Sequence, residues 1–176
     1  MSLTADGKER EQGNESANRI VAPAISGNGR YIVFATTANN MVAGDNNNFQ
    51  DVFIYDVSSG STVIVSNSAD GKPANEDSPV QQGEKIALSF DGNWVAFSTK
   101  ASNLGVPSAN IVMHNMTTGK NQPISSVTGS SVGQPVISCS GSYVVFGIGG
   151  KLDSRFPSTG IFANYTGAGP CRFCPQ

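Results

Sequence analysis

The sequence predicts an all-β fold in which short antiparallel strands form repeated four-stranded units. A strand–turn–strand motif occurs three times along the chain. Glycine is frequent, with 20 residues among 176, which is typical of many tight turns between short strands. No stretch sustains the 3.6-residue spacing of an amphipathic helix, so we expect almost no helix.

Each unit opens with two strands joined by a tight turn. The motif reads Ile/Leu-Ser-x-x-Gly-x-aromatic and ends in Phe, and its copies span 25–34, 88–97 and 137–146. Asn-Gly, Asp-Gly or Ser-Gly pairs suit a hairpin turn because Gly accepts positive φ at little cost. The β-branched and aromatic residues on either side of the turn suit a pleated strand.

A third and a fourth strand follow this hairpin. The third strand and its polar turn are predicted at 51–60 and 110–119, with a weaker copy at 160–165. Fourth strands are predicted at 62–66 and 122–125, the latter weakened by its proline. The third unit lacks a clear fourth strand after Tyr165.

These motifs together resemble the WD40-like repeat of TolB-type β-propellers. The segment 69–75, which resembles 5–11 one repeat earlier, and the long loop 39–50 are similar to that family as well. The resemblance covers roughly 5–169 and implies a propeller domain over 1–170 of about three four-stranded blades. The cysteine-containing tail, 171–176, lies outside it.

A propeller usually has about 4–8 blades, so three blades are incomplete. One hypothesis is that the N-terminal stub supplies part of the missing edge of the third blade. Another is that two or more copies associate into a ring, and a third is that the chain is a fragment of a longer propeller. Because open blades expose unpaired strand edges, we favour self-association or a fragment over a three-bladed monomer.

The loop from Asp45 to Asp51 is the best candidate for a metal site. Asp45, Asn47 and Asp51 place oxygen-bearing side chains at alternating positions, and Ca²⁺ takes 6–8 oxygen ligands. The loop lacks the bidentate Glu and fixed Gly of an EF-hand, and the alternative is a polar turn with Asp51 capping the next strand. No other cofactor is expected.

The cysteines and the single histidine are weaker candidates for a metal site than the loop from Asp45 to Asp51. Cys171 and Cys174 form a lone Cys-x-x-Cys pair, and a zinc site would need Cys139 and His114 to complete it. Cys139 and His114 both fall at ordinary repeat positions, so a structural role is expected for His114. The thiols of the tail are free or paired in an oxidising compartment.

Other side chains are assigned to packing or to loops. The aromatic residues of the first motif are expected to pack between blades: Tyr31, Trp94 and Tyr143 at one position and Phe34, Phe97 and Phe146 at another. Nothing in the sequence pairs Glu76, Asp77 or Glu84 for acid–base chemistry.

Composition excludes some classes of function. The net charge is −2 and the Lys and Arg residues are scattered, so we expect no nucleic-acid partner. No apolar stretch is long enough to span a bilayer, so no membrane insertion is expected, and the N-terminus lacks the apolar centre of a signal peptide.

The expected function is a non-enzymatic protein–protein binding module, because no catalytic constellation is visible. The resemblance implies a bacterial protein of the periplasm or exterior with a protein partner, and self-association could complete the propeller. One alternative is an accessory or ligand-binding domain of an enzyme, for carbohydrate or peptide. The other is a structural repeat segment of a larger surface protein.

Overall fold

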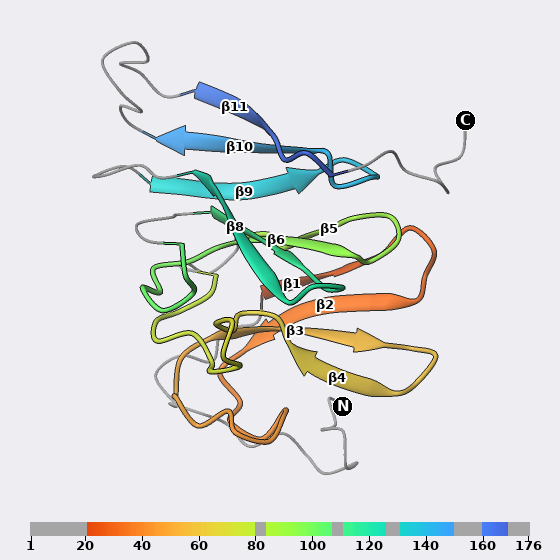
Figure 1. Ribbon diagram of the computed structural model, residues 1–176, viewed down its shortest axis with the longest axis vertical. Helices are drawn as coiled ribbons and strands as arrows, with labels where there is room; N and C mark the ends of the chain where they lie inside the picture. The colour runs from red at the N-terminus through yellow and green to blue at the C-terminus, as the bar shows by residue number, and fades with distance from the viewer. Residues whose placement is uncertain (1–20, 80–83, 107–110, 126–130, 150–159, 169–176) are drawn as a thin grey trace.

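The computed structural model describes residues 21–79, 84–106, 111–125, 131–149 and 160–168. Over these residues the chain forms eleven strands in three antiparallel sheets and no helix. The sheets lie one above another, with the first at the bottom of Figure 1 and the third at the top. The predicted all-β fold is confirmed.

Each sheet is one blade, and its strands follow chain order. Blade 1 contains β1 (Val21–Ile25), β2 (Tyr31–Thr36), β3 (Asp51–Asp56) and β4 (Ser61–Ile64). Blade 2 contains β5 (Ala87–Leu88), β6 (Trp94–Ser98), β7 (Ile111–Asn115) and β8 (Lys120–Ser125). Blade 3 contains β9 (Ser131–Ile137), β10 (Tyr143–Gly149) and β11 (Gly160–Tyr165).

Hydrogen bonds inside each copy of the first hairpin explain why the spacing of Ser and Gly repeats. In blade 1, Tyr31 N–H donates to Ser26 Oγ over 2.9 Å, and Gly29 N–H donates to the Ser26 carbonyl over 2.9 Å. Gly29 has φ +72°, a conformation that is unfavourable in free energy for residues with a Cβ atom. Ser89 and Ser138 repeat these bonds in the other blades.

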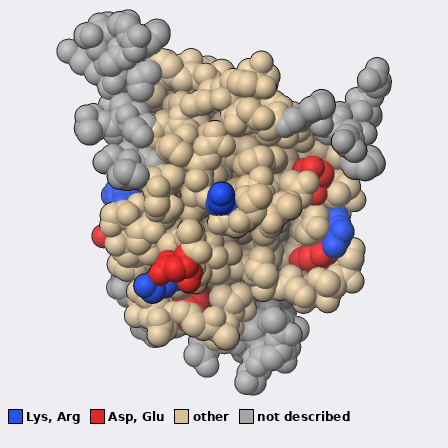
Figure 2. All heavy atoms as spheres, in the orientation of Figure 1, with Lys and Arg blue, Asp and Glu red and all other residues tan. Residues whose placement is uncertain are grey.

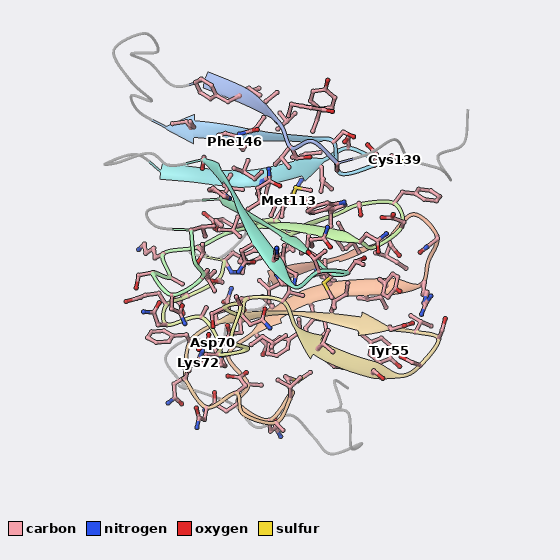
Figure 3. The ribbon with its side chains drawn as sticks, viewed as in Figure 1. Tyr55, Asp70, Lys72, Met113, Cys139 and Phe146 are labelled. Carbon is pink, nitrogen blue, oxygen red and sulfur yellow. The ribbon has the colours of Figure 1, made fainter. Side chains whose placement is uncertain are left out.

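The linker after blade 1 contains the same turn. Lys72 N–H donates to Ser68 Oγ over 3.1 Å, and Gly71 N–H donates to the Ser68 carbonyl over 2.9 Å. Asp70 accepts from Ser68 Oγ and pairs with Lys72 over 2.8 Å (Figure 3). The segment 5–11, which 69–75 resembles in sequence, lies outside the described residues.

Blade 2 accommodates the proline of its fourth strand by a register shift. Val112 faces Pro123, whereas Ile111 faces Ser125, so the pairing of β7 with β8 slips between these positions. Such an irregularity is where a proline without an N–H is tolerated in a ladder. β8 is longer than the segment 122–125 predicted for it.

Apolar side chains fill the two interfaces between blades. Between blades 1 and 2, Val33, Val52 and Phe97 are fully buried in one cluster. Between blades 2 and 3, Met113 and Phe146 belong to a second cluster, and Figure 3 labels both. The first strands β1, β5 and β9 contact one another in that order and form the inner side of the stack.

Blade 3 has three strands in the part of the chain that is described, as the sequence predicted. The order β11-β10-β9 leaves β11 at the edge of the sheet. The N-terminal stub that could supply a fourth strand and the tail 171–176 both lie outside the described residues.

Candidate functional site

The predicted metal-binding residues lie in the loop between β2 and β3, which holds Asp45 and Asn47, and at the start of β3, which begins with Asp51. Asn47 Nδ2 donates to Asp51 Oδ2 over 2.7 Å and to the Ala74 carbonyl over 2.8 Å. Asn47 Oδ1 accepts from Phe49 N–H over 2.8 Å, so both ends of this amide are engaged. Ser66 Oγ donates to Asp51 Oδ1 over 2.5 Å, so each oxygen of Asp51 has a donor.

Burial raises the pKa values of two carboxyl groups in the segment 45–51, here called the acidic loop. Asp51 is fully buried, and burial raises its pKa to about 7 against the opposing effect of the bonds from Ser66 and Asn47. The charges of Asp45 and Asp77 raise the pKa of Asp51 further. Burial also raises the pKa of Asp45 to about 6, although the Asn47 N–H bond lowers it.

Asp77, in the linker after blade 1, contacts the acidic loop, and the sequence did not predict this contact. Its Oδ1 accepts from Gln50 N–H over 2.9 Å, and Ser78 N–H donates to the Gln50 carbonyl over 2.7 Å. These contacts join segments 27 residues apart, in the linker and in the loop. No local motif in the sequence signals such a contact.

Three oxygens of the loop between β2 and β3 are buried without a hydrogen-bond donor among the described residues: Asn39 Oδ1, Asp45 Oδ1 and Gln50 Oε1. Among the described residues, no group of three or more His, Cys, Asp and Glu side chains is arranged to hold a metal ion. A calcium ion also takes amide and carbonyl oxygens, so the expectation for Asp45, Asn47 and Asp51 stays a prediction.

His114 is a structural residue, as expected. It is 3% exposed on β7, and its Nδ1 lies 2.8 Å from Asn121 Oδ1 on β8. Burial lowers the pKa of His114, against the opposing effect of this bond. Asn121 Nδ2 donates to the carbonyls of Asn67 and Leu104, which fixes the amide that holds the ring.

Cys139 is disulfide-bonded, and the two other cysteines of the sequence lie outside the described residues. Its sulfur is therefore no zinc ligand in this state. Figure 3 places Cys139 at the hairpin turn of blade 3. Glu84, a carboxylate for which the sequence offered no partner, is buried and accepts a bond from Ser98 Oγ.

The aromatic residues of the first motif pack between blades in two copies of three. A Cβ at Gly92 would lie 2.1 Å from the Tyr31 ring, and one at Gly141 would lie 2.5 Å from the Trp94 ring. Each ring therefore rests directly on the hairpin glycine of the next blade. Phe97 and Phe146 are buried between blades, and Phe34 packs in a cluster on the outer side of blade 1.

Tyr143 departs from the predicted packing. It is 52% exposed, and its ring pairs with Tyr165 of the same blade at a centroid distance of 5.3 Å. The physical reason is that no described residue provides a following hairpin glycine for this ring.

Tyr143 belongs to a broad apolar surface, here called the open face of blade 3. Cross-strand partners share one face of a sheet, and residues two apart on a strand do as well. The pairs Tyr143–Tyr165, Val145–Ala163 and Gly147–Ile161, with Val136 opposite Val145, thus lie on the side away from blade 2. Val136 is 60% exposed, Ile161 82% and Tyr165 64%.

The described residues of blade 3, which form the open face, carry no charge. The described segments 131–149 and 160–168 contain no Asp, Glu, Lys or Arg. In Figure 2 the coloured charged atoms lie over the middle and lower parts of the molecule, away from the region of β9 to β11. By contrast, the outer strand β8 of blade 2 carries Lys120 and Pro123, which discourage pairing at a sheet edge.

Stacked four-stranded antiparallel sheets whose first strands meet on one side are the blades of a β-propeller. No protein-family model matches the chain, and no curated protein sequence matches it either. Solved structures do match. TolB from Acinetobacter baumannii superimposes with a TM-score of 0.53 and 18% identity, over 92% of this chain and 33% of that chain.

Two enzymes are also among the similar structures. An oligogalacturonate lyase in complex with manganese has a TM-score of 0.50 and 14% identity, over 84% of this chain and 38% of that chain. A prolyl endopeptidase has a TM-score of 0.49 and 19% identity, over 84% of this chain and 20% of that chain. The chain spans about a third of the length of TolB, and its fold is that of a partial TolB-like propeller.

Proposed function

We propose that this chain is a non-enzymatic protein–protein binding module that docks its partner on the open face of blade 3. The observation that carries the proposal is the exposure of Val136, Tyr143, Ile161 and Tyr165 on one uncharged sheet face. Contiguous exposed apolar surface of this kind marks interaction sites in soluble proteins. The two tyrosines at one end of this face suit a protein partner, because aromatic side chains are enriched in interfaces.

The neighbouring strand edge supports the same face. β11 lies at the edge of its sheet with neither a charge nor a proline along Gly160–Tyr165. Natural sheet edges are usually protected by such residues. An unprotected edge beside an apolar face therefore favours a partner that covers both the edge and the face.

The chemistry of the described side chains supports binding rather than catalysis. His114 is buried and bonded to Asn121, which argues against its use as a general base. The carboxylates of the acidic loop are hydrogen-bonded within the loop and its linker, and Glu84 is buried against Ser98.

We place the module in the envelope or outside the cell. The disulfide at Cys139 supports this location, because disulfides persist in oxidising compartments and are rare in the cytosol. No helix among the described residues is long and apolar enough to cross a membrane.

The experiment is site-specific photo-crosslinking in cells that make the protein. A benzophenone amino acid replaces Tyr143, and a control chain carries it at Val63, which is 46% exposed on β4 and lies on the side of the sheet that faces blade 2. We expect one discrete adduct from position 143 and none from position 63. The absence of an adduct at 143, or the same adducts from both positions, would refute the proposal.

A second proposal concerns the acidic loop, which we propose binds Ca²⁺ through Asp45 and Asp51. The supporting observation is that Asp45 Oδ1 and Gln50 Oε1 are buried oxygens without a donor. Added Ca²⁺ should raise the thermal unfolding midpoint of chelator-treated protein, because a ligand that binds only the native state stabilises it. Asp45→Ala should abolish the rise, and Asp70→Ala, at an exposed carboxylate, should not. An unchanged midpoint of the parent protein on addition of Ca²⁺ would refute this proposal.

A further inference from the structure

The two interfaces between blades use the same pair of elements. The ring of Tyr31 rests on the Gly92 turn, and the ring of Trp94 rests on the Gly141 turn. Backbone bonds accompany each contact: Asn28 N–H donates to the Phe90 carbonyl over 3.2 Å, and Phe90 N–H donates to the Cys139 carbonyl over 3.0 Å. An aromatic ring on one blade and a hairpin turn on the next are therefore two halves of one joint.

Each end of the stack presents one unmatched half of this joint. On blade 3, Tyr143 occupies the position of Tyr31 and Trp94 but is 52% exposed. On blade 1, Gly29 occupies the position of Gly92 and Gly141 and has a similar positive φ, yet a Cβ there would meet no atom of the described residues within 4 Å. Among the described residues, Tyr143, a ring without a turn beneath it, and the Gly29 turn, which has no ring on it, lie at opposite ends of the three-blade stack.

The end of blade 1 is also apolar beside this turn. Ile25 is 62% exposed, and its cross-strand partner is Ile32 on β2. Phe34 lies on the same side of the sheet, because it is two residues from Ile32. This side faces away from blade 2, since Phe34 packs with Ala38, Met41 and Phe53 rather than with blade 2. The end of blade 1 is thus suited to receive the open face of blade 3.

We propose that the partner of the open face is a second copy of this chain, which contributes its blade 1. Tyr143 of one copy would rest on the Gly29 turn of the other copy, as Tyr31 rests on Gly92 within each copy. The contact is head-to-tail, and such contacts close into a ring when the rotation allows it. Two copies would then form six blades, within the range of about 4–8 that propellers have. This inference rests on the proposed function, because it names the partner of the same face.

The experiment measures mass by light scattering on a size-exclusion column. The parent chain should have twice the chain mass of 18.3 kDa. Tyr143→Asp, on blade 3, and Ile25→Asp, on blade 1, should each give a monomer, because each variant breaks both joints of the ring. Val63→Asp, at an exposed apolar residue of β4 on the side of the sheet that faces blade 2, is the matched control and should stay dimeric. Circular dichroism checks that every variant keeps its β spectrum.

Mixing the two monomeric variants is the decisive step. An equimolar mixture retains one intact joint, between Tyr143 of the Ile25→Asp chain and the blade 1 end of the Tyr143→Asp chain. We therefore expect a heterodimer in the mixture although neither variant dimerises alone. A monomeric parent, variants that stay dimeric, or a mixture that stays monomeric would overturn the inference. A crosslink from position 143 to a different protein would also overturn it and would leave the binding module intact, whereas no crosslink refutes both.

Discussion

Gly92→Ala tests the joint between blades, because it adds one methyl group where the backbone and the neighbouring ring both oppose it. Gly92 has φ +78°, and an L-residue in the left-handed region costs about 1–2 kcal/mol. The new Cβ would also lie 2.1 Å from Tyr31 Cδ2, so the ring must move by more than an ångström to reach ordinary contact. Overpacking of this kind typically costs about 1–3 kcal/mol. We expect Gly92→Ala to lower the free energy of unfolding by about 2–5 kcal/mol, a large part of a typical stability of about 5–15 kcal/mol.

The chain offers a matched control for each part of this cost. Gly29 has φ +72°, and no atom in the described part of the chain lies within 4 Å of its Cβ position, so Gly29→Ala should cost only the backbone part, about 1–2 kcal/mol. Gly27 has no positive φ, but its Cβ would lie 2.0 Å from the Phe90 ring, so Gly27→Ala reports the steric part. All variants are made in the Tyr143→Asp background, so that self-association does not contribute.

The assay is urea unfolding followed by the fluorescence of Trp94, the single tryptophan. A double-mutant cycle with Tyr31→Ala isolates the contact, since Gly92→Ala should lose its steric cost once the ring is removed. The reasoning is refuted if Gly92→Ala costs no more than Gly29→Ala, or if Gly92 and Tyr31 show no coupling in the cycle.

Two further predictions concern the acidic loop and the disulfide. Because Asp51 has a pKa of about 7 when folded and an ordinary value of 3.8, the folded state binds more protons between these values, and the free energy of unfolding should fall as pH rises from about 4 to 7, by up to about 4 kcal/mol. Urea unfolding at several pH values checks this, and Asp51→Asn should flatten the profile; an equally steep profile in that variant contradicts the assignment. Reductant should lower the thermal midpoint of the parent protein, by the equivalent of about 2–4 kcal/mol, but leave Cys139→Ser unaffected. An equal effect of reductant on both proteins would exclude the disulfide as the cause.

The parts of the fold that the sequence predicts are those set by local contacts. Ser26, Gly29 and Tyr31 lie within six residues of one another, and their turn depends only on bonds among them, so the motif is visible in each copy. The repeated motif also predicts Phe97 and Phe146 between blades, and both are buried there.

The parts that the sequence does not predict depend on contacts between distant segments. Asp77 joins the acidic loop through Gln50, 27 residues away, and the raised pKa of Asp51 depends on this packing rather than on its neighbours in sequence. The exposure of Tyr143 depends on which surface lies beside blade 3. The hairpin motif that contains Tyr143 carries no information about that surface. The motif therefore predicts the blade but not its neighbour.

The repeated ring-on-turn joint makes each blade depend on the blades beside it, which is the condition for nearest-neighbour cooperativity in repeat proteins. Blade 2 is joined on both sides, by Tyr31 to Gly92 and by Trp94 to Gly141, whereas blade 3 is joined on one side. In the monomeric Tyr143→Asp variant, amide hydrogen exchange should therefore be slowest in β6 and β7 and faster in β10, since opening a terminal blade breaks one joint instead of two. Closure into a ring would abolish the terminal blades and make the exchange rates of the three blades converge.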